Sequence, residues 1–232
     1  MAQLSWPTFD VAEIAEEASE RAGIEFRSGY ALRTARRALE LLAIEWANRG
    51  LNLWTVDGPV VVNLQPGLER YSLPEDTIDL VEHVIRQPST SSASAQDIPL
   101  DRWSFAEYSA LPNKMAPGRP TLIHVRRAIR PYFVVWMVPP SNSSYQVVYW
   151  RLRRMRSVGQ GGAGVPDIPW RFVPAMIAGL AFYLALKSKE KGALDRVQLL
   201  KSEYEEQFGL AADEDRDRAP VRFVPGGGYE VI

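Results

Sequence analysis

Residues 28–56 read SGYALRTARRALELLAIEWANRGLNLWTV, a long helical pattern followed by a tryptophan-bearing exit. Apolar residues spaced three and four apart form one stripe suited to a bundle core: Leu32, Ala35, Leu39, Leu42 and Trp46. A second apolar pair, Leu41 and Ile44, falls on a different side of this helix. A helix that is apolar on two faces needs two packing partners. We therefore expect Leu41, Ile44 and Trp54 to lie at a subunit interface.

The composition describes a globular chain with no general attraction to nucleic acid or membranes. Its 232 residues are 46% hydrophobic, and the net charge is −1. Without cysteine there is no disulfide framework and no thiolate site, and we expect synthesis in the cytoplasm. The start MAQLSWPTFD lacks the basic and apolar regions of a signal peptide. The longest apolar run, residues 176–186, is about half a membrane span, so we expect a buried helix and no membrane contact.

The first and last parts of the chain have helical patterns. Asp10 and Glu13 form a capping box that opens a helix with an acidic outer face, which ends at Gly23. Pro174 predicts a late start for the helix that follows Trp170. A final helix carries a stripe of spaced apolar residues: Leu194, Val197, Leu200, Tyr204 and Phe208.

The middle of the chain has a strand pattern. Residues 59–64 and 68–73 flank a Gln-Pro-Gly turn and predict a hairpin, and residues 78–86 predict a further strand. A short helix is expected at 104–110. Three strands follow Pro120, in the stretches TLIHVRR, PYFVVWMV and SYQVVYWRLRR. Both alternating sets of the middle stretch are apolar, which predicts a strand covered on both faces.

Two stretches rich in small residues predict exposed loops, PSTSSASAQ at 88–96 and GQGGAGVP at 159–166. The second contains the spacing G-x-G-x-x-G of dinucleotide-binding loops. Pro166 and Pro169 stand where the phosphate-binding helix would begin, so we interpret it as a plain connector.

These patterns predict an α+β fold: an antiparallel helical bundle of about four helices, with an inserted antiparallel β-rich region and an extended C-terminal tail. The expected division is 1–56 for the first half of the bundle, 57–165 for the β-rich insertion, 166–212 for the second half and 213–232 for the tail.

The sequence offers little for catalysis. His83 and His124 lie in predicted strands without partners at catalytic or metal-binding spacing, and the adjacent Glu205 and Glu206 are typical of a solvated helix face. We expect no enzyme activity, no cofactor and no metal. The enzymatic alternative is a cell-wall hydrolase that uses Glu203 or Glu206.

The strongest local charge is basic: Arg151, Arg153, Arg154 and Arg156. Such a cluster can contact a nucleic-acid backbone, as in a nucleic-acid-binding regulator, or pair with carboxylates of a neighbouring subunit. Because the chain as a whole is not basic, we favour carboxylate pairing. The acidic helix at 10–22 is the obvious supply of partners, in this subunit or the next.

Five stretches, in their order along the chain, carry a family resemblance: SGYALRTARRALELLAIEWANRGLNLWTV, GRPTLIHVRR, SYQVVYWRLRRM, PWRFVPAMIAGLAFYLALK and LKSEYEEQFGLAADEDRDRAPVRFVP. They resemble the head-to-tail adaptor, or tail tubular protein A, family of short-tailed bacteriophages. The resemblance covers nearly the whole chain and includes no catalytic signature.

The resemblance implies a structural virion protein at the portal–tail junction. It implies a homo-oligomeric ring, commonly of twelve subunits, beneath the portal protein and above the tail nozzle protein, with tail fibres as a further candidate partner. Double-stranded DNA would pass through the ring without sequence specificity. The C-terminal tail would dock into the portal with anchoring and polar residues: Phe223, Val224, Tyr229, Arg216, Arg218 and Arg222.

Overall fold

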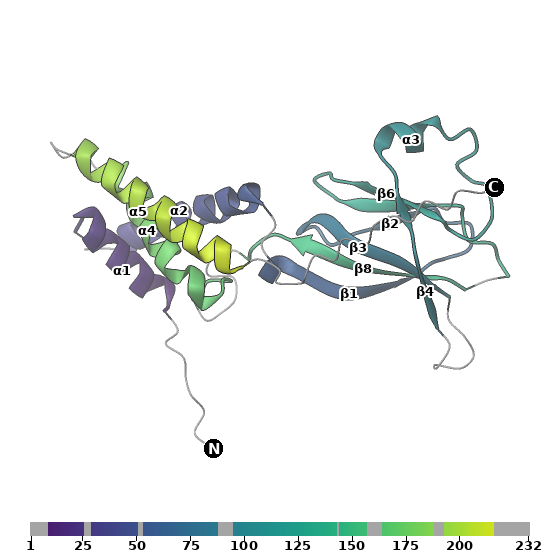
Figure 1. Ribbon diagram of the computed structural model, residues 1–232, viewed down its shortest axis with the longest axis horizontal. Coiled ribbons are helices and arrows are strands. Elements are labelled where there is room, and N and C mark those ends of the chain that lie inside the picture. Colours follow the sequence, from purple (N-terminus) through teal and green to yellow (C-terminus); the bar gives the residue numbers. More distant parts are fainter. Residues whose placement is uncertain are drawn as a thin grey trace, which may run out of the picture.

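A computed structural model describes residues 9–25, 29–50, 53–87, 95–142, 144–156, 164–187 and 193–215. The longer helices gather at one end of an elongated molecule, and the β-strands form the other end together with the short helix Phe105–Ala110 (Figure 1). The mixed α+β class with antiparallel sheets, predicted from the sequence, is therefore confirmed.

Four longer helices build the helical part: α1 (Val11–Ala22), α2 (Gly29–Arg49), α4 (Val173–Ala185) and α5 (Ala193–Glu214). The predicted capping box at the start of α1 is present, and Gly23 ends the helix in the left-handed conformation with φ of 70°. The predicted late start of α4 is also confirmed. A 3₁₀ turn, η3 (Trp170–Phe172), precedes α4, and Pro174 stands in its first turn.

The four helices share one hydrophobic core, in which α4 contacts α1, α2 and α5. The largest fully buried side chains of this core include Ile14, Leu39, Trp46, Phe172 and Tyr204. The core stripe predicted for α2 lies here, since Ala35, Leu39, Leu42 and Trp46 are buried and Leu32 packs against them. This shared core supports the prediction of a helical bundle. The antiparallel arrangement of its helices stays a prediction.

The β part consists of two four-stranded sheets. The first has the order β1 (Val56–Asn63), β8 (Gln146–Arg153), β3 (Thr77–Gln87), β4 (Gln96–Pro99). The second has the order β2 (Arg70–Ser72), β7 (Tyr132–Trp136), β6 (Leu122–Arg126), β5 (Asp101–Arg102). Neighbouring strands are antiparallel except β5 and β6, which are parallel. The predicted short helix is α3 (Phe105–Ala110).

Residues of both sheets form a second core, separate from that of the helices. It includes Ile85 of β3, Tyr149 of β8, and Phe133 and Val135 of β7. Val134, which alternates with these two β7 residues, is buried as well. The prediction that this strand is covered on both faces is thus confirmed.

The predicted hairpin at 59–73 is wrong. β1 pairs with β8 in one sheet, whereas β2 pairs with β7 in the other. The Gln-Pro-Gly segment does form a local turn, since the Leu68 amide donates to the Gln65 carbonyl at 3.2 Å. The turn nevertheless carries the chain from one sheet to the other, and the Gly67 amide donates to the Pro139 carbonyl at 3.0 Å. A turn sequence predicts a change of direction but not the pairing of the strands beside it.

The boundary of the tail also differs from the expectation. α5 continues to Glu214, so the first two residues of the expected 213–232 tail are helical. Burial of Ala211 and the hydrogen bond between Leu53 and Asp215 hold this last turn against the helical part. Residues 88–94, 157–163 and 216–232 lie outside the described residues. Most of both predicted loops and nearly all of the tail are among them.

Candidate subunit interface and the junction behind it

α2 presents an apolar face to solvent on the side away from its core. Leu41 is 49% exposed and Ile44 is 58% exposed, whereas Leu39, Leu42 and Trp46 on the other side are fully buried. The structure thus places the second apolar pair on the surface of the single chain. Exposure of two adjacent large apolar side chains on a helix marks a candidate interface.

This face borders an open hollow of about 950 Å³ between α2 and the start of β3. Its apolar lining comes from α2, β3 and the segment after β8: Ala43, Ile44, Ala47, Ile78 and Met155. Its polar lining carries both signs of charge: Glu40, Asn48, Glu75, Asp76, Arg154 and Arg156. The hollow therefore combines apolar and charged side chains, as protein interfaces commonly do.

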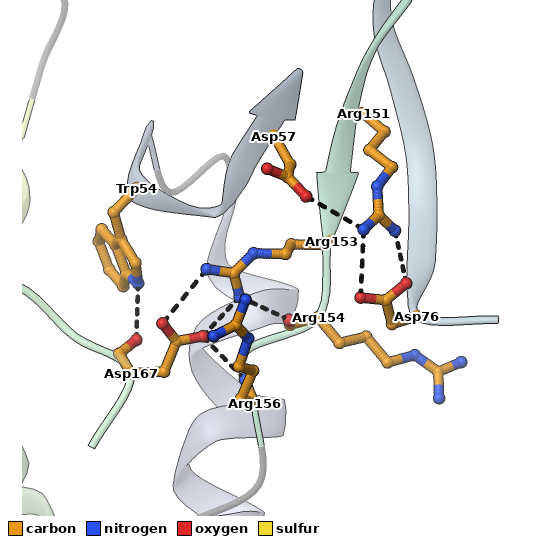
Figure 2. A network of polar contacts seen from close by, with 8 residues as sticks. All are labelled: Trp54, Asp57, Asp76, Arg151, Arg153, Arg154, Arg156 and Asp167. Carbon is orange, nitrogen blue, oxygen red and sulfur yellow. Dashed lines mark hydrogen bonds and ion pairs between the residues drawn. The ribbon is translucent and has the colours of Figure 1, made fainter. Parts of the chain in front are cut away.

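Behind the hollow, Arg151 joins the ends of three strands. It is buried, and its guanidinium lies 2.5 Å from the Asp76 carboxylate and 3.1 Å from that of Asp57 (Figure 2). It also donates to the Thr77 hydroxyl at 3.0 Å. Burial alone would lower the pKa of Arg151, but hydrogen bonding to Asp76 and the charges of Asp76 and Asp57 outweigh burial and raise it. Arg151 is therefore charged, and its ion pairs and hydrogen bond hold the ends of the three strands together.

Arg153 ties β8 to the segment that leads into α4. Its guanidinium lies 2.5 Å from the Asp167 carboxylate, which also accepts from the Arg156 amide at 3.0 Å. The Trp54 indole donates to the Asp167 carbonyl at 3.1 Å (Figure 2). Burial would raise the pKa of Asp167, but the hydrogen bonds from Arg153 and Arg156 outweigh it and lower the pKa. Asp167 is thus the point where the helical and β parts are fastened together.

The arginine cluster divides into two pairs. Arg151 and Arg153 are committed to carboxylates of their own chain, while Arg154 and Arg156 have exposed side chains. In Figure 2 the Arg154 guanidinium points away from the carboxylates drawn. For Arg151 and Arg153, the expectation that the acidic helix α1 supplies the carboxylates is wrong, because Asp57, Asp76 and Asp167 supply them. Sequence spacing could not reveal them, since they lie 14 to 94 residues away.

The expected interface residue Trp54 lies inside its own chain. It is half-buried, and its ring centroid is 4.4 Å from that of Phe172 in the helical core. Its indole nitrogen is also satisfied within the chain. Of the three side chains expected at an interface, the structure leaves Leu41 and Ile44 on the surface.

A second polar network holds the C-terminal half of α2. The Glu45 carboxylate accepts from Tyr183 at 2.7 Å and from Tyr204 at 3.0 Å, and Arg49 joins it to Glu205 of α5. Burial and the hydrogen bond to Glu45 raise the pKa of Tyr183 to about 12. The spacing of Glu45 and Arg49 predicts one of these ion pairs, whereas both tyrosines are missed because their partner is distant in sequence.

The described segments hold no cluster of three or more histidine, aspartate or glutamate residues that could bind a metal. Glu203 and Glu205 form ion pairs with Arg21 and Arg49. No described helix is long and apolar enough to cross a bilayer. The six expected portal-docking residues, from Arg216 to Tyr229, lie outside the described part of the chain.

An exposed apolar helix face marks a site at which another protein can bind. The model of the SU10 adaptor protein family matches residues 10–224, and the chain belongs to that family. This confirms the resemblance to phage head-to-tail adaptors, and it makes the chain an adaptor protein of a bacteriophage, a structural part of the virion. None of the curated proteins matches the sequence.

Proposed function

We propose that this adaptor forms a homo-oligomeric ring beneath the portal, connects the capsid to the tail nozzle and lines the path of the DNA. The observation that carries the proposal is the exposed pair Leu41 and Ile44 beside an open hollow. A neighbouring copy that covers this pair would remove apolar surface from water, a gain of roughly 25 cal/mol for each Å².

The ion pairs of the junction support a mechanical role. The junction pairs Arg151 with Asp76 and Arg153 with Asp167 at 2.5 Å each, and both arginines are nearly buried. Charge pairs that are shielded from solvent hold a defined geometry better than exposed ones. A connector that joins two large assemblies needs such a fixed angle between its parts.

The charge of the chain supports a passage through which DNA slides. A net charge of −1 gives no general electrostatic attraction to DNA phosphates. The charges of Arg151 and Arg153 are also balanced by aspartates of the same chain. This also counts against a nucleic-acid-binding regulator that uses the arginine cluster, because aspartates of the same chain engage two of its four arginines. No observation favours the hydrolase, since Glu203 pairs with Arg21.

The partners follow from the adaptor class. We assign the portal protein above the ring, the nozzle protein below it and twelve copies in the ring, with tail fibres as a further candidate partner. The anchoring and polar residues of the C-terminal segment would enter the portal: Phe223, Val224, Tyr229, Arg216, Arg218 and Arg222.

Sedimentation of the purified chain with its portal tests the proposal. The adaptor should move into the portal fraction in a fixed ratio close to one copy for each portal subunit. The proposal fails if the adaptor stays at the rate of a single chain at every portal concentration. A variant that ends at residue 215 keeps the described helices and tests the tail, because it should stay folded and no longer bind.

A further inference from the structure

The outer face of α2 is basic as well as apolar. Arg33, Arg37, Leu41 and Ile44 are spaced by three or four residues and share one side of the helix, and all four are exposed. Arg36 stands beside them and is exposed too. A partner for this face must bring carboxylates to its N-terminal half and small or apolar side chains to its C-terminal half.

The outer face of α1 has the matching chemistry. Its buried side carries Val11, Ile14, Ala15 and Ala18, so the opposite side faces solvent. That side carries exposed carboxylates at Glu13, Glu16 and Glu20 and a small exposed residue at Ala12. Phe9, just before the helix, is 42% exposed. This is an acidic surface with an apolar end.

The two faces also match in length. α1 has 12 residues, and residues 33–44 of α2 are 12 residues as well, so each face is roughly 18 Å long. Antiparallel docking would place the Phe9 and Ala12 end of α1 at Leu41 and Ile44, near the hollow. The same docking would place Glu16 and Glu20 toward Arg37 and Arg33.

One chain cannot join these faces to each other. α1 and α2 bury their other sides in the same helical core, so both outer faces point away from it. A contact between the two faces must therefore link different copies. Because the surfaces differ, each copy uses one face on each neighbour, and such head-to-tail contacts generate rings when the rotation closes.

We propose that the acidic outer face of α1 docks onto the Arg33–Arg37–Leu41–Ile44 face of α2 in the next copy. The inference rests on the proposed ring and names the surfaces that close it. The occupant of the α2 face is a second copy of this chain.

Paired charge reversals test this contact on portal-templated assembly. Arg33→Glu with Arg37→Glu makes the α2 face acidic, and Glu16→Arg with Glu20→Arg makes the α1 face basic. Each double variant should assemble about tenfold or more weakly than wild type, because like charges then meet. An equimolar mixture should recover assembly with the two variants alternating around the ring. Arg119→Glu with Arg126→Glu is the control, because it makes the same charge change on exposed residues of the β part and should assemble normally.

Cysteine cross-linking gives a second measurement, since the chain has no cysteine of its own. The double variant Ala12→Cys with Leu41→Cys, which face each other in this register, should give a ladder of disulfide-linked oligomers on the portal. Leu41→Cys with Leu199→Cys, which replaces an exposed leucine of α5, should give none. Provided that wild type assembles, any one of three results would overturn the α1–α2 contact. The three results are that each charge-reversed variant assembles as well as wild type, that their mixture fails to recover assembly, or that the cysteine variant gives no ladder. If wild type itself does not bind the portal, the proposed ring function fails instead.

Discussion

The Arg153 guanidinium lies 2.5 Å from the Asp167 carboxylate, and this ion pair joins the last residue of β8 to the segment that enters α4. The same aspartate accepts from the Arg156 amide through its carboxylate and from the Trp54 indole through its carbonyl. One residue therefore fastens β8, the exit of α2 and the entry of α4. We therefore expect Asp167 to help fix the angle between the helical and β parts.

Replacing Asp167 should loosen this junction. Asp167→Asn removes the charge that balances Arg153, whose side chain is only 11% exposed. We expect the free energy of unfolding to fall by about 2 kcal/mol, less than for a fully buried pair because Asp167 is 24% exposed. Urea unfolding followed by circular dichroism measures the loss. Arg154→Ala, a change on an exposed side chain nearby, should alter stability by less than about 0.5 kcal/mol, and an equal loss in both variants would contradict the role of Asp167.

Acid should weaken the same pair. The pKa of Asp167 is lowered in the folded chain, so its stabilising contribution is complete above the ordinary aspartate pKa of 3.8. The contribution is lost as the pH falls from there through the lower folded pKa. The stability difference between wild type and Asp167→Asn should therefore shrink below about pH 4. A difference that stays constant from pH 6 to pH 2.5 would mean that the carboxylate does not titrate as described.

A matched pair of glycine substitutions tests the packing of α4. A Cβ at Gly179 would lie 2.9 Å from Leu42 Cδ1 and 2.9 Å from Tyr204 Cε2, so Gly179→Ala should destabilise the chain by about 1–3 kcal/mol. A Cβ at Gly209 of α5 would meet no atom within 4 Å. Gly209→Ala should stabilise the chain by about 0.5–1 kcal/mol through helix propensity alone. Thermal unfolding measures the stability of both variants. Equal changes in stability would refute the close contact of α4 with α2 and α5.

The helices could be predicted from the sequence because their signals are local. The capping box at Asp10, the spacing of Leu39, Leu42 and Trp46, and the effect of Pro174 all act within a few residues. The exposure of Leu41 and Ile44 follows from the same spacing, since side chains on the opposite side of a helix from its core stripe cannot reach that core.

The pairing of strands and the partners of the arginines could not be predicted in this way. β1 pairs with β8, and Val60 lies opposite Tyr149. Arg151 meets Asp57 and Asp76 only because the sheet brings distant segments together. No local period encodes such contacts, and alternation along a strand shows its faces but not its neighbour.

The apolar face of α2 should matter for assembly and not for folding. Leu41→Ser with Ile44→Ser changes side chains that are 49% and 58% exposed, so the melting temperature of the single chain should stay within a few degrees of wild type. Binding to the portal should nevertheless be lost, because the contact with the next copy loses its apolar centre. Leu199→Ser with Leu210→Ser, on exposed leucines of α5, is the matched control. Equal portal binding by all three proteins would remove the α2 face from the interface.

Electron microscopy of the adaptor mixed with its portal measures the central claim most directly. The account predicts a closed ring of adaptor density against the portal, with α2 of each copy covered by its neighbour. Portals that carry no adaptor, or single adaptor copies bound with Leu41 and Ile44 facing solvent, would contradict it.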